Sequence, residues 1–277
     1  MNAQNNSGTV LESLEIDSRI LNKKVNYSIY LPPNYNHSQR KYPIVYLLHG
    51  YTDDETGWIQ FGEVQRIVDE GINNGSIPPM IIAMPDAGVS WYINNFDNSI
   101  RYEDFFINEF IPHIEMSYLV RPKKEFRGIT GLSMGGYGSL LYAMKYAHLF
   151  AACAPMSAPI YTKEEVVSYD QERWDYVEGV LYGKNLVGEA RITDHWKSYN
   201  PLFIAQQKGT EKLSEVKYYF DCADDDFLYK GNAAMHVLLR DLNVPHEFRV
   251  RDGAHNWTYW RTALPEVLAF IGESFRR

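Results

Sequence analysis

The sequence predicts an α/β fold in which a mostly parallel central sheet is covered by helices on both faces. Apolar runs alternate with amphipathic helical stretches along most of the chain, an alternation typical of βαβ units. Several runs contain no polar residue, as expected for strands buried on both faces. With 277 residues, the chain has a size that α/β enzymes often reach as one domain. We therefore expect a single domain over residues 1–277.

The predicted strands differ in pattern along the chain. Two segments with alternating polar and apolar residues come first, at about residues 11–18 and 24–31. The apolar runs follow, and the further strands are expected at residues 44–48, 80–84, 126–130, 150–156, 216–220 and 246–250. Apolar residues at helical spacing predict helices at residues 63–71, 103–118, 134–146, 232–242 and about 257–275.

Two segments do not fit the alternation of predicted strands and helices. Residues of about 160–212 are mostly polar, with Tyr and Trp but few long apolar runs. We expect an insertion or lid over the carboxyl edge of the sheet, where such folds bind ligands. Residues of about 1–9 are predicted to be a flexible N-terminus. No signal peptide stands at the start as numbered, so a secreted or periplasmic origin and a cytoplasmic one both fit the sequence.

Charge and apolar content exclude several partners. The net charge is −8, and the dense basic runs are short, at residues 121–124 and 276–277, so neither nucleic acid nor an anionic membrane is expected as a partner. No apolar run approaches the length of a transmembrane helix. Cys153 and Cys222 each lie in an apolar, strand-like run and are expected to be buried free thiols.

The strongest functional signal is the Gly-x-Ser-x-Gly pattern of residues 131–135, centred on Ser133. A pattern of this kind arises by chance in roughly one chain in ten of this length. Its position, between a predicted strand and a predicted helix, is that of a nucleophile elbow. Side chains at Gly131 and Gly135 would collide with backbone there. No Gly-Lys-Ser/Thr follows, and Gly-x-Gly-x-x-Gly is absent, which excludes a phosphate loop and a dinucleotide site.

A serine nucleophile needs a base, and His255 is the candidate. In folds with this elbow the order along the chain is Ser, acid, His. His255 lies in the loop after the last predicted strand and before the last helix. His236, inside a helical pattern, and His246, at a strand start, are interpreted as structural.

The acid is expected in the turn after residues 216–222. That turn offers Asp224, Asp225 and Asp226, with Asp221 just before it, and the spacing leaves the choice open. Adjacent acids can also bind calcium, but the spacing and glycine of a calcium loop are missing. No metal and no other cofactor is expected.

Attack by a serine nucleophile on a carbonyl group produces a negatively charged tetrahedral intermediate, which two backbone N–H groups must stabilise. These are predicted to be the N–H groups of Met134 and Tyr51.

At this point the sequence resembles the esterase D-like branch of the α/β hydrolases, over about residues 10–275. The resemblance rests on Tyr-Leu-Leu-His-Gly at 46–50, Gly-Leu-Ser-Met-Gly-Gly at 131–136, Asp-Cys-Ala-Asp-Asp-Asp-Phe-Leu at 221–228 and Gly-Ala-His at 253–255. It is most similar to the feruloyl esterase domains of carbohydrate esterase family 1.

The resemblance implies an α/β-hydrolase fold, Asp226 as the acid, and oxyanion amides on Tyr51 and Met134. Two departures stand out. Ala223 replaces a usual glycine, and Tyr51-Thr52-Asp53 stands where the S-formylglutathione hydrolases of this branch have a Cys-Thr pair. Mycolyltransferases share the fold, but the sequence supports no long acyl-chain groove.

We therefore expect a serine carboxylesterase, a feruloyl esterase that cleaves plant cell-wall esters through an acyl-enzyme. Its substrate would be a small-molecule or oligosaccharide ester. Trp91, Tyr92 and Trp257 lie on loops expected near the pocket, where they either stack on a phenolic ring or pack locally. The alternatives are an acetyl xylan esterase or broad small-acyl carboxylesterase, and a carbohydrate-binding protein on a hydrolase scaffold.

Overall fold

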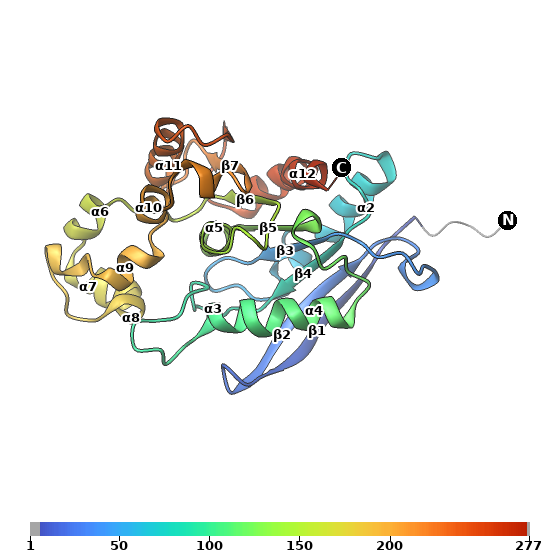
Figure 1. The fold of residues 1–277 in the computed structure, drawn as a ribbon, viewed down its shortest axis with the longest axis horizontal. Coiled ribbons are helices and arrows are strands. Elements are labelled where there is room, and N and C mark those ends of the chain that lie inside the picture. The colour runs from blue at the N-terminus through green and yellow to red at the C-terminus, as the bar shows by residue number, and fades with distance from the viewer. Residues whose placement is uncertain (1–5, 276–277) are drawn as a thin grey trace.

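The computed structural model describes residues 6–275, which form a central sheet between two helical layers (Figure 1). The strands are β1 (Thr9–Ser18), β2 (Lys23–Leu31), β3 (Ile44–Leu48), β4 (Ile81–Pro85), β5 (Arg127–Leu132), β6 (Ala152–Met156), β7 (Lys217–Ala223) and β8 (His246–Arg251). Each lies within a few residues of its predicted position.

The strand order across the sheet is β1-β2-β4-β3-β5-β6-β7-β8. β2 runs antiparallel to both of its neighbours, whereas every pairing from β4 to β8 is parallel. The mostly parallel sheet is thus confirmed. Because the parallel strands all end at one edge, the loops that follow them meet there.

Four of the longer helices lie at their predicted positions: α2 (Val64–Asn74), α5 (Met134–Lys145), α11 (Tyr229–Asp241) and α12 (Trp257–Ser274). A further long helix, α10 (Pro201–Leu213), lies in the segment that was expected to be an insertion and was not predicted. The single helix expected at 103–118 is instead divided into α3 (Tyr102–Phe105), a π-helical turn (Phe106–Phe110) and α4 (Ile111–Ser117). Pro112 lacks an N–H and cannot make the regular helical hydrogen bond, which accounts for the wider turn just before it.

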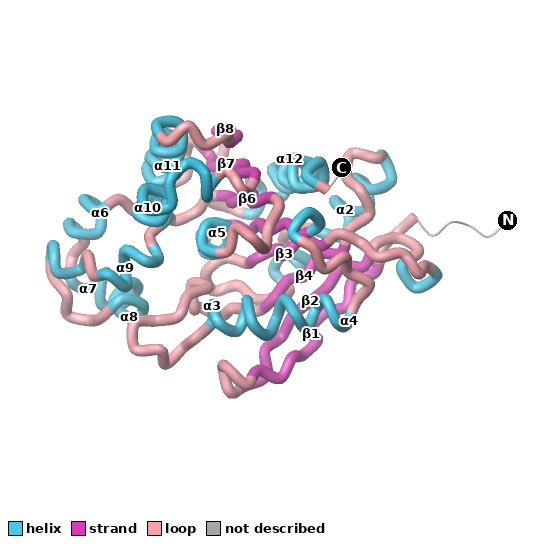
Figure 2. Tube along the Cα trace, viewed as in Figure 1, coloured by secondary structure: helices cyan, strands magenta, loops and turns pink. Residues whose placement is uncertain are grey.

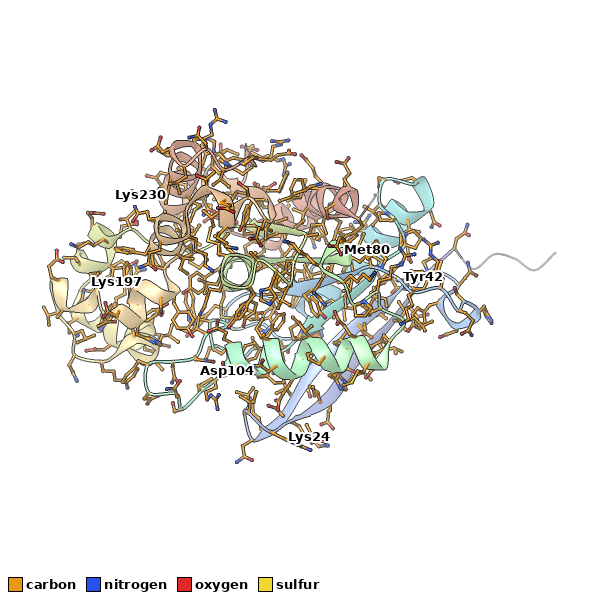
Figure 3. All side chains as sticks on the ribbon, viewed as in Figure 1. Lys24, Tyr42, Met80, Asp104, Lys197 and Lys230 are labelled. Atoms are coloured by element: carbon orange, nitrogen blue, oxygen red, sulfur yellow. The ribbon has the colours of Figure 1, made fainter. Side chains whose placement is uncertain are left out.

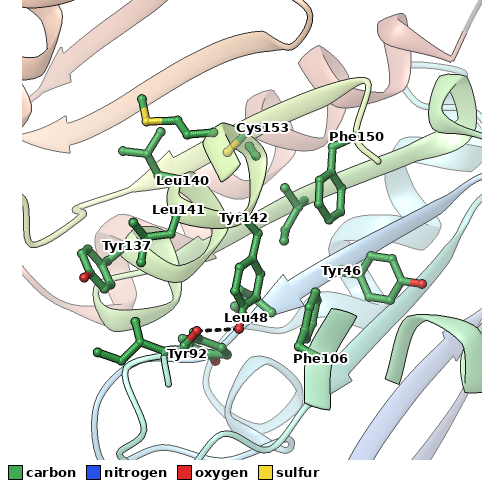
Figure 4. Close-up of a cluster of buried hydrophobic side chains, with 14 of the residues drawn as sticks. Tyr46, Leu48, Tyr92, Phe106, Tyr137, Leu140, Leu141, Tyr142, Phe150 and Cys153 are labelled. Carbon is green, nitrogen blue, oxygen red and sulfur yellow. Dashed lines mark hydrogen bonds between the residues drawn. The ribbon is translucent and has the colours of Figure 1, made fainter. Parts of the chain in front are cut away.

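Two apolar cores lie on opposite faces of the sheet. One packs the α3–α4 segment, α5 and α11 against the strands, and Figure 4 shows part of it, with Phe106 stacked on Tyr142 at a centroid distance of 4.6 Å. The other packs α2 and α12 against the opposite face, where Met80 is also buried. Side chains fill the space between the layers (Figure 3). Cys153 and Cys222 are buried and free, as predicted.

Short helices make up most of the predicted insertion, and they gather at one end of the molecule (Figure 2). They are α6 (Lys163–Ser168), α7 (Gln171–Arg173), α8 (Gly179–Tyr182) and α9 (Asp194–Tyr199), with a π-helical turn at Trp174–Glu178. The Tyr199 hydroxyl donates to the buried Glu103 carboxylate at 2.5 Å, and Lys145 pairs with the same group at 2.6 Å. This paired buried charge ties the insertion to the α3 and α5 layer.

Residues 1–5 of the segment expected to be flexible lie outside the described residues. The rest of that segment has defined contacts. The Gly8 N–H and the Ser7 hydroxyl each donate to the Asp69 carboxylate of α2 at 2.7 Å, and β1 begins at Thr9.

Candidate active site

Ser133 occupies a tight turn between β5 and α5. Its backbone has φ of 50° and ψ of −120°, in the left-handed half of the map that costs a non-glycine residue about 1–3 kcal/mol. The turn is held by the Ser133 N–H, which donates to the Met156 carbonyl at 2.9 Å. The strain presents the serine side chain at the carboxyl edge of the sheet.

Gly135 lets this turn lie against the end of β3. A Cβ atom there would be 2.4 Å from the Leu48 carbonyl oxygen and 2.6 Å from that of His49. Both are backbone atoms, which cannot rotate away as a side chain can. The close approach brings the loop after β3 next to the serine.

We expect Gly135→Ala to lower the free energy of unfolding by about 2–4 kcal/mol, because the added methyl group forces the elbow away from β3. Gly88→Ala is the comparison, because Gly88 has φ of 49° and no atom within 4 Å of an added Cβ, so alanine there adds backbone strain alone. Gly135 lies in α5 and has no positive φ, so alanine there adds the contact with β3 alone. Urea denaturation of both variants measures the difference. A loss in Gly135→Ala below about 2 kcal/mol and no larger than that in Gly88→Ala would contradict the expected cost of the contact.

The structure brings Ser133, His255 and Asp226 together from three different loops. His255 Nε2 lies 3.0 Å from Ser133 Oγ, and His255 Nδ1 lies 2.9 Å from Asp226 Oδ2. Nδ1–H donates to the carboxylate, which leaves Nε2 free to accept the serine proton. The imidazole contacts two aromatic rings, with centroid distances of 4.7 Å to Phe227 and 4.9 Å to Trp260. The arrangement is that of a nucleophile, a base and an orienting acid.

The buried Asp226 side chain is ionised in this setting. Burial alone would raise its pKa, but hydrogen bonds from His255, from the Leu228 N–H and from the Ser157 hydroxyl outweigh burial and lower the pKa below 3.8. Of the other acids left open by spacing, Asp224 and Asp225 are exposed, and Asp221 pairs with Arg251. Asp226 alone of the four contacts His255 in the described part of the chain.

The two predicted oxyanion amides stand at chain positions suited to the role. Met134 is the first residue of α5, and the first N–H groups of a helix have no partner within it. Tyr51 follows β3 in a loop whose conformation His49 stabilises. The His49 ring contacts the Gly50 carbonyl oxygen through Nδ1 and the Ala87 N–H through Nε2, both at 2.8 Å. Within residues 6–275, neither the Tyr51 nor the Met134 N–H donates a hydrogen bond to another group.

Ser133 and His255 open into a cleft of about 480 Å³, called the cleft below. Aromatic and charged side chains line it, including Tyr51, Trp91, Tyr161, Glu178, Phe227 and Trp257. Trp91 and Trp257 thus lie where they were expected.

Tyr92 differs from the expectation that it contacts substrate. Its side chain is fully buried below the cleft, and its hydroxyl donates to the His49 carbonyl at 3.1 Å. Figure 4 places it among the core side chains next to Tyr142, whose hydroxyl donates to the Tyr92 carbonyl. Tyr92 therefore supports the loop after β3 from beneath. Adjacent loop residues point in opposite directions here, and sequence does not reveal which of them faces the cleft.

Several residues near the site were not predicted from the sequence. The Ser157 hydroxyl accepts from the Trp260 indole N–H at 3.0 Å and also hydrogen-bonds Asp226. Arg173 and Glu178, from the insertion, line the cleft that contains Ser133. The position of Ser157 just after β6, at the carboxyl edge, was the one available signal.

Residues 6–275 contain no group of three or more His, Cys, Asp or Glu side chains placed to hold a metal ion. The helices in this part of the chain are also too short or too polar to cross a membrane.

Similar proteins carry the same fold. A solved ferulic acid esterase superposes with a TM-score of 0.82 at 31% identity, covering 97% of this chain and 99% of the other. Esterase Rv1288 of Mycobacterium tuberculosis is 28% identical over 82% of this chain and 52% of its own length, so the chain spans about half of that relative. The acetyl esterase of Caldicellulosiruptor saccharolyticus is 25% identical, covering 83% of each.

The Esterase family, described as "Putative esterase", matches residues 18–271, nearly the whole chain. This match agrees with the parallel sheet, the elbow at Ser133 and the superposition on an esterase. The chain belongs to this Esterase family and has the α/β-hydrolase fold.

Proposed function

We propose that this protein is a serine carboxylesterase that cleaves hydroxycinnamoyl esters, such as feruloyl groups on plant cell-wall polysaccharides. The observation that carries the proposal is the continuous hydrogen-bonded series from Asp226 through His255 to Ser133 at the floor of an aromatic cleft. Its position at the carboxyl edge of the sheet is where such folds bind substrate.

In the proposed reaction, Ser133 Oγ attacks the ester carbonyl while His255 Nε2 takes the serine proton. The negative charge on the carbonyl oxygen is stabilised by the N–H groups of Tyr51 and Met134. His255 then donates the proton to the leaving alcohol, and the acyl group stays on Ser133. Water, deprotonated by His255, releases the acid and restores the serine, while Asp226 holds the imidazole and stabilises its positive form.

The lining of the cleft supports an aromatic acyl group. Trp91 lies edge-on to Tyr137 with 5.8 Å between centroids, and both Trp91 and Tyr161 line the cleft beside Ser133. Flat apolar walls suit a cinnamoyl ring, which gains from burial and from ring contacts. Similarity to a ferulic acid esterase over 97% of the chain supports the same substrate class.

An acetyl esterase is the second candidate, favoured by the similarity to the acetyl esterase of C. saccharolyticus. It would use the same chemistry with a smaller acyl group. A carbohydrate-binding protein without activity is disfavoured, because the hydrogen bonds that activate a serine are all present.

The test compares kcat/KM for methyl ferulate and p-nitrophenyl acetate. We expect methyl ferulate to be cleaved with the higher kcat/KM, because the ring binds the aromatic walls and adds binding energy that acetate lacks. Efficient cleavage of p-nitrophenyl acetate alone would indicate that the enzyme prefers esters of small acyl groups. No cleavage of either, together with binding of xylo-oligosaccharide, would instead support the binding protein.

A further inference from the structure

Glu178 is a buried carboxyl to which no group in the described residues donates a hydrogen bond. It ends the π-helical turn at Trp174–Glu178, its side chain is 6% exposed, and neither carboxyl oxygen has a hydrogen-bond partner within residues 6–275. A buried carboxyl in this state is unfavourable, and most buried polar groups do have partners. The unused oxygens therefore point to a group that the chain itself does not supply.

The cations near Glu178 do not fill this role. Arg173 Nη2 stays 3.9 Å from Glu178 Oε1, with the guanidinium over the Tyr169 ring at 3.9 Å. Arg191 donates its hydrogen bonds to the carbonyls of Leu186, Val166 and Tyr169 and to the Gln171 side chain. Both positive groups are near enough to attract the carboxylate, but neither hydrogen-bonds it.

Glu178 lies where the cleft leads into a small side recess. It lines the cleft together with Ser133, and it also lines an adjoining space of about 20 Å³, called the recess below. The recess is walled mainly by aromatic side chains, including Trp91, Tyr137, Tyr182 and Tyr199. A space of this size holds one water molecule or one substrate hydroxyl.

Three tyrosine hydroxyls around the recess, those of Tyr137, Tyr182 and Tyr199, are already engaged. Tyr137 OH donates to the Tyr199 carbonyl at 2.6 Å and contacts Tyr182 OH at 2.9 Å. Tyr199 OH donates to Glu103. The Glu178 carboxyl is therefore a buried acceptor that is open to a hydrogen bond from a ligand that enters along the cleft.

We propose that Glu178 is a specificity-determining residue that accepts a hydrogen bond from a hydroxyl at the far end of the bound acyl group. The inference rests on the proposed esterase function, because the acyl group is defined by attack at Ser133. It identifies the preferred substrates as esters whose acyl ring carries a phenolic hydroxyl. An acyl group of the same shape without the hydroxyl leaves the buried carboxylate without a hydrogen bond, which is a basis for rejection.

The protonation of Glu178 makes this preference depend on pH. Burial raises its pKa to about 7, the positive charges of Arg173 and Arg191 limit the rise, and Asp170 adds to it. The phenols facing it, Tyr161, Tyr169 and Tyr182, have pKa values raised by burial and stay neutral near pH 7. Above this pH the carboxylate is charged, so the absence of a donor is most costly. Preference for the hydroxylated acyl group therefore increases as pH rises.

The experiment measures kcat/KM for methyl 4-hydroxycinnamate and methyl cinnamate between pH 5.5 and 8.5. Each enzyme is characterised by the ratio of the two values, because pH effects common to both esters cancel in this ratio. In the wild type we expect a ratio that favours the hydroxylated ester and rises by about 10-fold with pH. Glu178→Gln should lower the ratio at high pH by about 10- to 100-fold and remove its pH dependence. Glu172→Gln, on the exposed α7, is the matched control.

Equal ratios in the wild type and Glu178→Gln would overturn the proposal and assign the recess to a water that satisfies a structural carboxyl. If Glu178→Gln does not fold, the wild type alone tests the proposal: a ratio of the two kcat/KM values that does not change with pH would also overturn it. Calorimetric binding of the two esters to Ser133→Ala separates this proposal from the esterase function. Tighter binding of the hydroxylated ester, lost in the Ser133→Ala, Glu178→Gln double variant, supports the subsite even if no ester is turned over.

Discussion

Replacing Ser133 with alanine is expected to reduce kcat for ester hydrolysis by roughly 10⁵-fold or more, with little change in KM for a slowly reacting ester. The substitution removes the Oγ atom that lies 3.0 Å from His255 Nε2, and no other hydroxyl in the described residues contacts that nitrogen. Residual hydrolysis would come from the oxyanion amides and from substrate binding. Steady-state kinetics on p-nitrophenyl acetate and methyl ferulate measures the loss.

The Ser133 variant should fold normally. Alanine and serine are both Cβ-bearing residues, so the strain at φ of 50° stays much the same. A matched control is Ser168→Ala, which removes an exposed hydroxyl from α6 and should retain full activity. A serine-directed phosphonate should label the wild type and Ser168→Ala but not Ser133→Ala. Undiminished turnover or labelling in Ser133→Ala would show that a different residue is the nucleophile.

Replacing Asp226 with asparagine is expected to reduce kcat by about 10³- to 10⁴-fold. Asparagine keeps the size of the side chain, but its amide N–H₂ can donate to His255 Nδ1. That donation would favour the imidazole tautomer that carries its proton on Nε2, and this tautomer cannot accept the proton of Ser133. The carboxylate that stabilises the imidazolium is lost as well.

Asp225→Asn is the control for this variant, because Asp225 is exposed one residue earlier in the same turn. It should retain activity within a factor of about two, because an exposed carboxylate that makes no contact with the imidazole contributes little. A large loss in Asp225→Asn with a small one in Asp226→Asn would contradict the role proposed for Asp226.

Stability should also respond to pH through Asp226. Its pKa is lowered in the folded protein, so its favourable contribution is present above the usual value near 3.8 and is lost as pH falls towards the folded-state pKa.

The sequence by itself determined the layered α/β fold. Uninterrupted apolar runs such as 44–48 can be buried only between two helical layers, and the alternation of strand and helix fixes a parallel sheet. The Gly-x-Ser-x-Gly turn could also be predicted from the sequence. Its glycines are needed because a Cβ atom at either position would collide with nearby backbone in any chain that forms this turn. The strands, the helices and this turn depend on residues close together along the chain, so patterns in the sequence can predict them.

The tertiary structure decided which side chains meet across the cleft. Spacing did not choose among four aspartates, and before the structure only the family resemblance indicated Asp226. The pairing of β7 with β8 brings Asp226 Oδ2 to 2.9 Å from His255 Nδ1. Tyr92 and Trp91 are adjacent in sequence, yet only Trp91 lines the cleft. Glu178 reaches the same space as Ser133 because the insertion folds back over the carboxyl edge of the sheet. Contacts of this kind join residues distant along the chain, so no local periodicity encodes them.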